Sequence, residues 1–123
     1  MNPDIKAKWL EDLRSGEFTQ GKGYLTRVTP DGEKDCCWGL LCRLAVTAGI
    51  IGAGQYDDDA EDAISYDGGI EMPTEKVLDW AGIPLRAVAV SGKVTCLETL
   101  NDGTSSLGQY SFAQIADIIE EQM

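Results

Sequence analysis

Three basic side chains near the N-terminus have the type and spacing that could bind an anion. They are Arg14, Lys22 and Arg27, and glycines at positions 21 and 23 flank the lysine. A guanidinium group can form paired hydrogen bonds to a phosphate, and glycine-rich backbone can turn its N–H groups toward the same oxygens. The pattern predicts a phosphate-binding surface over residues 14–28. A plain flexible connection is the alternative interpretation of the two glycines.

Two aromatic residues could complete such a surface by stacking on a nucleotide base. Tyr24 lies in the same segment as the basic residues, and Trp9 comes shortly before it. Aromatic rings bind bases through their faces, so this contact tolerates many bases. The alternative for Trp9, as for the other two tryptophans, is to anchor the core.

Charge is distributed unevenly along the chain. Residues 1–34 hold six basic and six acidic side chains, whereas residues 35–123 hold four basic and 15 acidic ones. The net charge of −11 therefore belongs to the later part, and the first third is the better host for an anion. The acidic balance argues against direct binding to nucleic acid or to anionic membranes.

A second candidate site is the acidic segment at residues 57–62. Its carboxylates belong to Asp57, Asp58, Asp59, Glu61 and Asp62. An EF-hand calcium loop starting at Asp57 would need glycine in its sixth position and glutamate in its twelfth, where this chain has Asp62 and Gly68. We interpret the segment as a solvated loop, with a weak divalent-ion site or a partner-binding face that mimics nucleic acid as the alternatives.

The four cysteines predict core packing rather than a metal site or a nucleophile; they are Cys36, Cys37, Cys42 and Cys96. Structural zinc sites usually pair cysteines as C-x-x-C or combine them with histidine, and this chain has no histidine. We expect no metal or cofactor. Histidine is also the usual base that activates a serine or cysteine nucleophile, so we do not expect an enzyme.

Length and composition predict a single compact α+β domain that spans residues 1–123. A hydrophobic content of 43% is enough for a real core. No stretch approaches the roughly 20 apolar residues of a membrane span, and the first residues lack the apolar stretch of a signal peptide. We therefore expect a cytoplasmic protein without membrane contact.

Capping residues and terminating glycines predict about four helices. They are residues 3–15 between Asn2 and Gly16, a helix capped by Asp35 that stops at Gly49, a short helix before Gly82, and a closing helix that begins with a capping box of Ser111 and Gln114.

Alternating and β-branched residues predict one or two β-hairpins. Residues 24–28 lead into a turn at residues 30–32, and residues 85–90 and 94–100 are two β-prone runs joined by a tight turn. Whether the two hairpins pair with each other stays open at this point. The segment between them at residues 50–71 is acidic and rich in glycine, which predicts a long loop.

Several blocks of the chain together resemble a family of small uncharacterised proteins of tailed bacteriophages and prophages. The blocks are residues 9–21, residues 36–42 with the sequence CCWGLLC, residues 77–82, residues 97–102 and residues 115–120. That family offers no catalytic residues to transfer. Asp35 stands where the family commonly has tyrosine or phenylalanine, and the segment at residues 50–71 is longer than usual.

The resemblance implies a phage accessory protein that acts in the host cytoplasm by binding. Our first hypothesis is a non-enzymatic protein that counters host antiviral defence by sequestering a nucleotide signal at Trp9, Arg14, Lys22, Tyr24 and Arg27. The second is an acidic interaction module that inhibits a host defence protein through residues 57–62. A structural or assembly role in the virion is the third, and a homo-oligomer is compatible with all three.

Overall fold

Five α-helices, a five-stranded mixed sheet and a separate β-hairpin make up the part of the chain that the structure describes. The structure is a computed structural model, and it describes residues 1–57, 62–84 and 86–123. The predicted α+β class is confirmed. Helices and strands are not segregated along the chain, because short strands fill most of the gaps between helices.

The helices are α1 Pro3–Ser15, α2 Cys37–Thr47, α3 Glu75–Ala81, α4 Leu97–Asp102 and α5 Phe112–Gln122. Local signals explain most of their ends. The Asn2 side chain accepts two backbone N–H groups of the first turn of α1, and Gly16 ends that helix in the left-handed conformation at φ 75°. Ser111 and Gln114 form the predicted capping box of α5. These predictions are confirmed.

Asp35 does not cap α2, contrary to our prediction. Cys36 occupies the cap position without a side-chain capping bond, while the Asp35 carboxylate accepts hydrogen bonds from Thr26 and Arg43. A hydrogen bond from a charged donor is stronger than one from a backbone N–H group, so the buried carboxylate bonds to the guanidinium.

α2 is buried on more faces than the single apolar stripe that the sequence predicts. Its buried residues are Cys37, Trp38, Gly39, Leu40, Leu41, Cys42 and Ala45.

The five-stranded sheet has the order β1-β3-β2-β5-β4. Its strands are β1 Thr19–Gln20, β2 Thr26–Thr29, β3 Gly32–Asp35, β4 Gln55–Tyr56 and β5 Ala63–Ser65. β1 and β3 are parallel, and the other neighbours are antiparallel.

The prediction of a long loop at residues 50–71 is wrong where this segment supplies β4 and β5. These strands are two and three residues long, too short for an alternating pattern to be visible in the sequence. β5 pairs with β2, and β4 pairs with β5, so the backbone groups of both strands find hydrogen-bond partners. The tertiary partner, and not the local sequence, therefore decides that they are strands.

The second hairpin consists of β6 Ala87–Val90 and β7 Lys93–Cys96, and it forms its own two-stranded sheet. The predicted second run at residues 94–100 is wrong beyond Cys96, where α4 begins. Leu97 and Leu100 are both fully buried. A strand would point residues three apart to opposite faces, whereas a helix points them to the same one, so burial of both leucines requires the helix.

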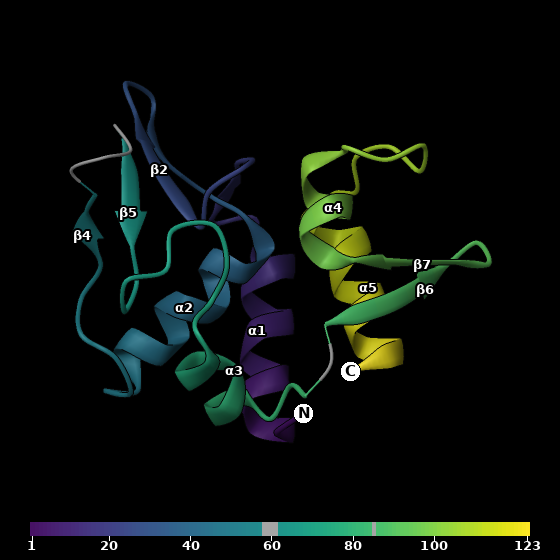
Figure 1. Ribbon diagram of the computed structural model, residues 1–123, viewed down its shortest axis with the longest axis horizontal. Coiled ribbons are helices and arrows are strands. Elements are labelled where there is room, and N and C mark those ends of the chain that lie inside the picture. The colour runs from purple at the N-terminus through teal and green to yellow at the C-terminus, as the bar shows by residue number, and fades with distance from the viewer. Residues whose placement is uncertain (58–61, 85) are drawn as a thin grey trace.

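The five-stranded sheet and the hairpin lie at opposite ends of the molecule, with helices between them (Figure 1). α1 packs against both α2 and α5, and α4 joins α2 to the hairpin. The centre of this core is a pair of fully buried indoles, Trp9 and Trp38, whose ring centres are 5.3 Å apart. Burial of two such large side chains makes this contact a major part of the core.

Candidate functional site

Arg27 and Lys34 lie directly opposite each other on the antiparallel strands β2 and β3. Directly opposed residues of such a pair point to the same face of the sheet. The adjoining pair, Thr26 and Asp35, is buried on the other face, toward α2. The two cations therefore share the outer face, where Arg27 is exposed and Lys34 is half-buried.

Tyr24 and Lys22 lie on the loop that precedes β2, and Tyr24 contacts Arg27 on this face. The guanidinium carbon of Arg27 lies 5.2 Å from the centre of the Tyr24 ring, within the range of a cation–π contact. Lys22 is exposed and follows Gly21, where a Cβ atom would lie only 2.9 Å from the Lys34 Cβ. The loop thus approaches Lys34 closely. We call Lys22, Tyr24, Arg27 and Lys34 the cationic surface.

The cations of this surface make no ion pair within residues 1–57, 62–84 and 86–123. The ion pairs found there belong to Arg14 and Arg43. Like charges directly opposite each other destabilise a pair of strands. An anion bound between Arg27 and Lys34 would remove that repulsion, which makes the cationic surface the best candidate for a ligand site.

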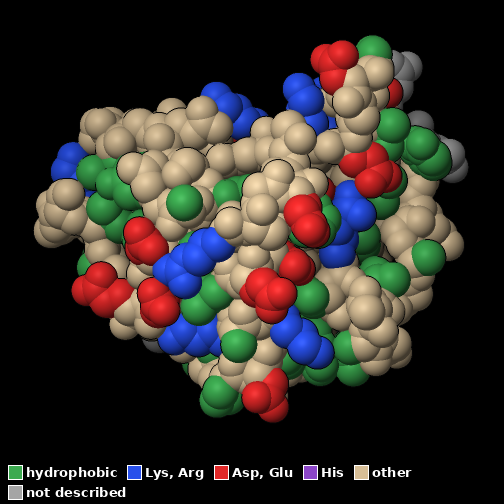
Figure 2. All heavy atoms as spheres, turned by 180° about the vertical axis from the view of Figure 1, so that it is seen from behind, with side chains coloured by type: hydrophobic (Ala, Val, Ile, Leu, Met, Phe, Trp, Pro, Cys, Tyr) green, Lys and Arg blue, Asp and Glu red, His purple; other side chains and the backbone are tan. Residues whose placement is uncertain are grey.

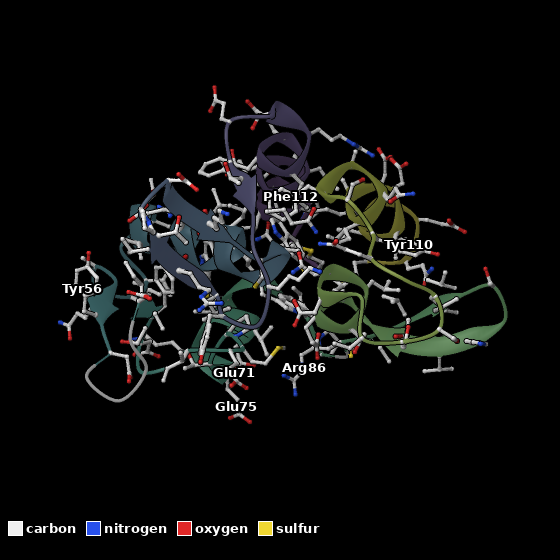
Figure 3. The ribbon with its side chains drawn as sticks, turned by 90° about the horizontal axis from the view of Figure 1, so that it is seen from above. Tyr56, Glu71, Glu75, Arg86, Tyr110 and Phe112 are labelled. Atoms are coloured by element: carbon white, nitrogen blue, oxygen red, sulfur yellow. The ribbon has the colours of Figure 1, made fainter. Side chains whose placement is uncertain are left out.

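Carboxylates limit the cationic surface on one side. Tyr24 also lines a cavity of about 110 Å³ together with Glu71, Glu98 and Asp102. Asp102 accepts the backbone N–H group of Gly23 at 3.1 Å and so fixes the loop that holds Lys22. Figure 3 shows Glu71 at the rim of the molecule. An anion is therefore favoured over β2 and β3 and disfavoured in this cavity.

The structure does not bring Arg14 into the cationic surface. Its Nη2 atom lies 2.8 Å from Asp117 and 2.9 Å from Glu120, both on α5. These hydrogen bonds to Glu120 and Asp117 raise the pKa of Arg14 and occupy its charge. On the face of the molecule shown in Figure 2, basic side chains lie among acidic ones, as Arg14 lies beside Asp117 and Glu120. That face has no large patch of positive or negative charge alone.

Trp9 lies in the core and has no exposed ring face with which to stack on a base. It is 0% exposed, and its indole N–H donates to the backbone oxygen of Cys37 at 2.9 Å. The alternative interpretation of Trp9 as a core anchor therefore fits the structure. Of the five ligand-binding residues selected from the sequence, the structure brings Tyr24 and Arg27 into contact, and Lys22 is exposed on the same loop as Tyr24.

Lys34 belongs to the cationic surface although the sequence reasoning did not select it. The available signal was the tight turn at residues 30–31, which folds β3 back on β2. Positions 27 and 34 are equally distant from that turn and therefore must oppose each other in a hairpin. Charge of the same sign at opposed positions was visible in the sequence once the turn was located.

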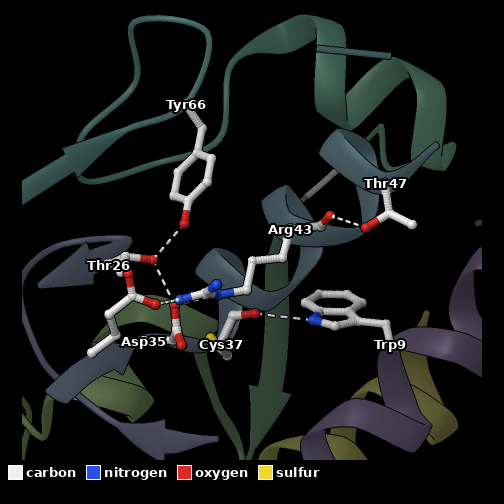
Figure 4. Close-up of polar contacts among 8 residues, drawn as sticks. Trp9, Thr26, Asp35, Cys37, Arg43, Thr47 and Tyr66 are labelled. Carbon is white, nitrogen blue, oxygen red and sulfur yellow. Dashed lines mark hydrogen bonds and ion pairs between the residues drawn. The ribbon is translucent and has the colours of Figure 1, made fainter. Parts of the chain in front are cut away.

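A buried polar network lies on the opposite face of the same strands (Figure 4). Asp35 Oδ1 accepts from Arg43 Nε at 2.9 Å and from Thr26 Oγ1 at 2.5 Å, and the Tyr66 hydroxyl lies 2.8 Å from that Thr26 oxygen. Arg43 also donates to Glu33 at 2.8 Å. The network joins α2, β2, β3 and the residue after β5, and so holds in place the strands that present Arg27 and Lys34.

Protonation in this network follows from burial and hydrogen bonding. Burial by itself lowers the pKa of the Arg43 guanidinium, but its hydrogen bonds to Asp35 and Glu33 raise that pKa above its ordinary value. Burial raises the pKa of Tyr66. A cavity of about 260 Å³ adjoins Arg43 and Tyr66. Because both carboxylates already pair with Arg43, this cavity is a poorer place for an anion than the cationic surface.

The acidic segment is described only at its two ends. Asp57 follows β4 and is half-buried, and Asp62 is exposed with a φ of 70°. Asp58, Asp59 and Glu61 lie outside the described residues. The partner-binding role of this segment therefore stays a prediction.

The cysteines are free thiols, and three of the four are buried in the core. Burial raises the pKa of Cys36 and that of Cys42 to about 12, and it raises the pKa of Cys37 well above the ordinary value. A thiol that stays protonated is a poor nucleophile and a poor metal ligand. Within the described residues, no group of three or more Cys, Asp or Glu side chains is placed to hold a metal ion.

The geometry defines a small α+β domain with the cationic surface on its five-stranded sheet. Acidic side chains outnumber basic ones in the rest of the chain. The chain belongs to the family of the domain of unknown function DUF8296, whose profile matches residues 1–123. No curated protein and no solved structure matches the chain. Among the described residues, no helix is long and apolar enough to cross a membrane.

Proposed function

We propose that this protein is a non-enzymatic binding protein that captures a small phosphorylated ligand on its cationic surface. The observation that best supports this proposal is that Arg27 and Lys34 lie directly opposite each other on β2 and β3. Within the described residues, neither is paired with a carboxylate. A protein with a net charge of −11 has many carboxylates that could neutralise these cations. Because no described carboxylate pairs with either cation, an external anion is favoured as their partner.

The ligand we propose is a nucleotide, because the cationic surface also contains an aromatic ring. Tyr24 is half-buried and lies next to Arg27, so a base stacked on the ring would place its phosphate near the guanidinium. The resemblance to proteins of tailed bacteriophages suggests the setting. There the protein would counter antiviral defence in the host cytoplasm by sequestering a nucleotide signal, without converting it.

Calorimetric titration with a panel of nucleotides tests this proposal. The panel contains mononucleotides and cyclic dinucleotides, with inorganic phosphate as the reference anion. We expect saturable binding of at least one nucleotide, weakened about tenfold by Arg27→Ala or Lys34→Ala, because each removes a charged hydrogen-bond donor. Arg14→Ala is the matched control, since it removes an arginine that α5 already neutralises. Equal loss in the Arg14 variant, or no nucleotide binding at all, contradicts the proposal.

An acidic interaction module remains the second candidate function. The observation in its favour is Tyr56, which is 68% exposed on the edge strand β4 and directly precedes the acidic segment (Figure 3). Tyrosine is enriched in protein interfaces relative to the rest of the protein surface. Capture of a host protein that Tyr56→Ala and 0.5 M salt both abolish would favour this function over nucleotide capture.

A further inference from the structure

The side-chain amide of Gln122, in the last turn of α5, binds the edge of β6 as a neighbouring strand would. Its Oε1 atom accepts the backbone N–H of Ala89 at 2.8 Å, and its Nε2 atom donates to the backbone oxygen of the same residue at 2.7 Å. Both polar groups of Ala89 therefore point away from β7. Gln122 is exposed, so water can replace Ala89 as its partner when the contact opens.

The same edge presents a second pair of backbone groups at Ala87. In an antiparallel ladder, residues alternate between those bonded to the partner strand and those that point outward. Ala89 faces Val94 across the hairpin and points outward, so Ala87, which faces Cys96, points outward as well. The outer edge of β6 thus has two sites for a further strand, and Gln122 occupies one of them.

A groove of about 300 Å³ begins at this edge. It is lined by Ala87 and Gln122 and by the apolar side chains of Met1, Ile83 and Met123. A strand placed beside β6 would direct alternate side chains toward the body of the protein, where this groove could accept an apolar one.

Apart from the Gln122 amide, the edge of β6 lacks the usual protection against strand addition. Exposed edges are commonly blocked by an inward-pointing charge, a proline or a bulge. The residues whose backbone groups point away from β7 are Ala87 and Ala89, and their side chains are small and exposed. The tip of the hairpin extends beyond the helices (Figure 1). Residues 80–97 contain no acidic side chain and two basic ones, the exposed Arg86 directly before β6 and Lys93 on β7, whose ammonium donates to the Ser106 hydroxyl at 2.9 Å. In a chain with a net charge of −11, this local positive charge favours an acidic partner.

We propose that the edge of β6 binds an extended acidic peptide as a third strand. The peptide displaces the Gln122 amide from Ala89, bonds to the backbone of Ala87 and Ala89, and places one apolar side chain in the groove. Its acidic residues lie near Arg86, which directly precedes β6 and is exposed. This interaction surface is separate from the cationic surface, because it is built from the hairpin and α5 and not from β2 and β3.

Fluorescence anisotropy with a labelled, end-capped peptide tests the proposal on the full chain. The probe is Asp-Val-Thr-Leu-Thr-Val-Asp, and its control carries N-methyl groups on alternate residues, which removes the amides that a strand must donate. We expect saturable binding of the probe and none of the control. Gln122→Ala removes the competing amide and should tighten binding about three- to tenfold, the effect of one or two hydrogen bonds.

Two proline variants provide a matched pair. Ala87→Pro removes an outward N–H on the proposed edge and should weaken binding about tenfold. Val94→Pro removes an outward N–H on the opposite edge of the same hairpin and should leave binding unchanged. Amide spectra by NMR verify that each variant keeps the hairpin.

Three outcomes would overturn the proposal. The first is equal binding of the N-methylated control, which would make the contact independent of strand pairing. The second is the absence of saturable binding to both the wild type and the Gln122 variant. The third is a dimer that forms in Gln122→Ala and is lost in Ala87→Pro, because the edge would then pair with a second copy of the chain.

Discussion

Gly39 in α2 lies directly against the backbone oxygen of Leu25, where a Cβ atom would come within 2.0 Å of that oxygen. The same oxygen accepts the backbone N–H of Cys36 at 3.0 Å. The first turn of α2 is therefore pressed against the chain that enters β2, and only glycine allows this approach. This contact explains the glycine within the sequence CCWGLLC.

Gly39→Ala should destabilise the protein by about 2–4 kcal/mol, because backbone and not a flexible side chain stands in the way of the new methyl group. Urea denaturation followed by tryptophan fluorescence measures the loss. Gly52→Ala is the control, since a Cβ at position 52 meets nothing within 4 Å. Equal free energies of unfolding for the two variants would show that α2 can move away from Leu25 without loss.

Lys34→Thr should stabilise the free protein by about 0.2–1 kcal/mol, because it removes the repulsion between Lys34 and Arg27 and introduces a good strand residue. The gain should shrink in 0.5 M salt, which screens exposed charges. Urea denaturation at both salt concentrations measures it. A clear loss of stability at low salt would mean that Lys34 contributes more by packing on Gly21 than it costs by repulsion.

Asp35→Ala should destabilise the protein by about 3–5 kcal/mol. The variant leaves the Arg43 guanidinium without its buried carboxylate, and breaking one side of a buried pair is more costly than the pair itself is worth. Glu33→Gln is the matched control, because Glu33 is 48% exposed and its contact with Arg43 should contribute less than about 1 kcal/mol. Similar losses in the two variants would contradict a special role for the buried contact.

The buried thiols should make the protein less stable in alkali. The pKa of Cys36 and that of Cys42 are raised by burial from 9.0 to about 12. Between pH 9 and 12 the folded state therefore holds more protons than the unfolded state, and the free energy of unfolding falls as the pH rises. Below pH 9 these thiols are protonated in both states and contribute no pH dependence. Urea denaturation at pH 8, 9.5 and 10.5, compared between the wild type and Cys42→Ala, measures the slope.

The same burial predicts the order of thiol alkylation at pH 8. Iodoacetamide should modify the half-buried Cys96 first and should reach Cys36, Cys37 and Cys42 only on unfolding. Mass spectrometry after increasing reaction times resolves the sites. Rapid modification of Cys36 in the native protein would show that this thiol is more accessible than its 3% exposure implies.

Part of the candidate site could be predicted from the sequence. Lys22, Tyr24 and Arg27 are close in the chain, so they remain close in almost any fold. That Arg27 faces Lys34 follows only from the register of the hairpin. That Arg14 and Trp9 do not belong to the candidate site follows only from their contacts with α5 and α2. The partners of Arg14 and Trp9 are more than 20 residues away from them in the sequence.

The sequence by itself determined the elements whose ends are set by neighbouring residues. α1 between Asn2 and Gly16, and α5 after its capping box, satisfy their backbone groups locally and follow an apolar period of 3.6. Only the tertiary structure decided that residues 55–56 and 63–65 are strands, that residues 97–102 are a helix, and that Asp35 pairs with Arg43. The physical reason is that short segments and buried polar groups obtain their stabilising partners from distant parts of the chain, and a local pattern does not contain those partners.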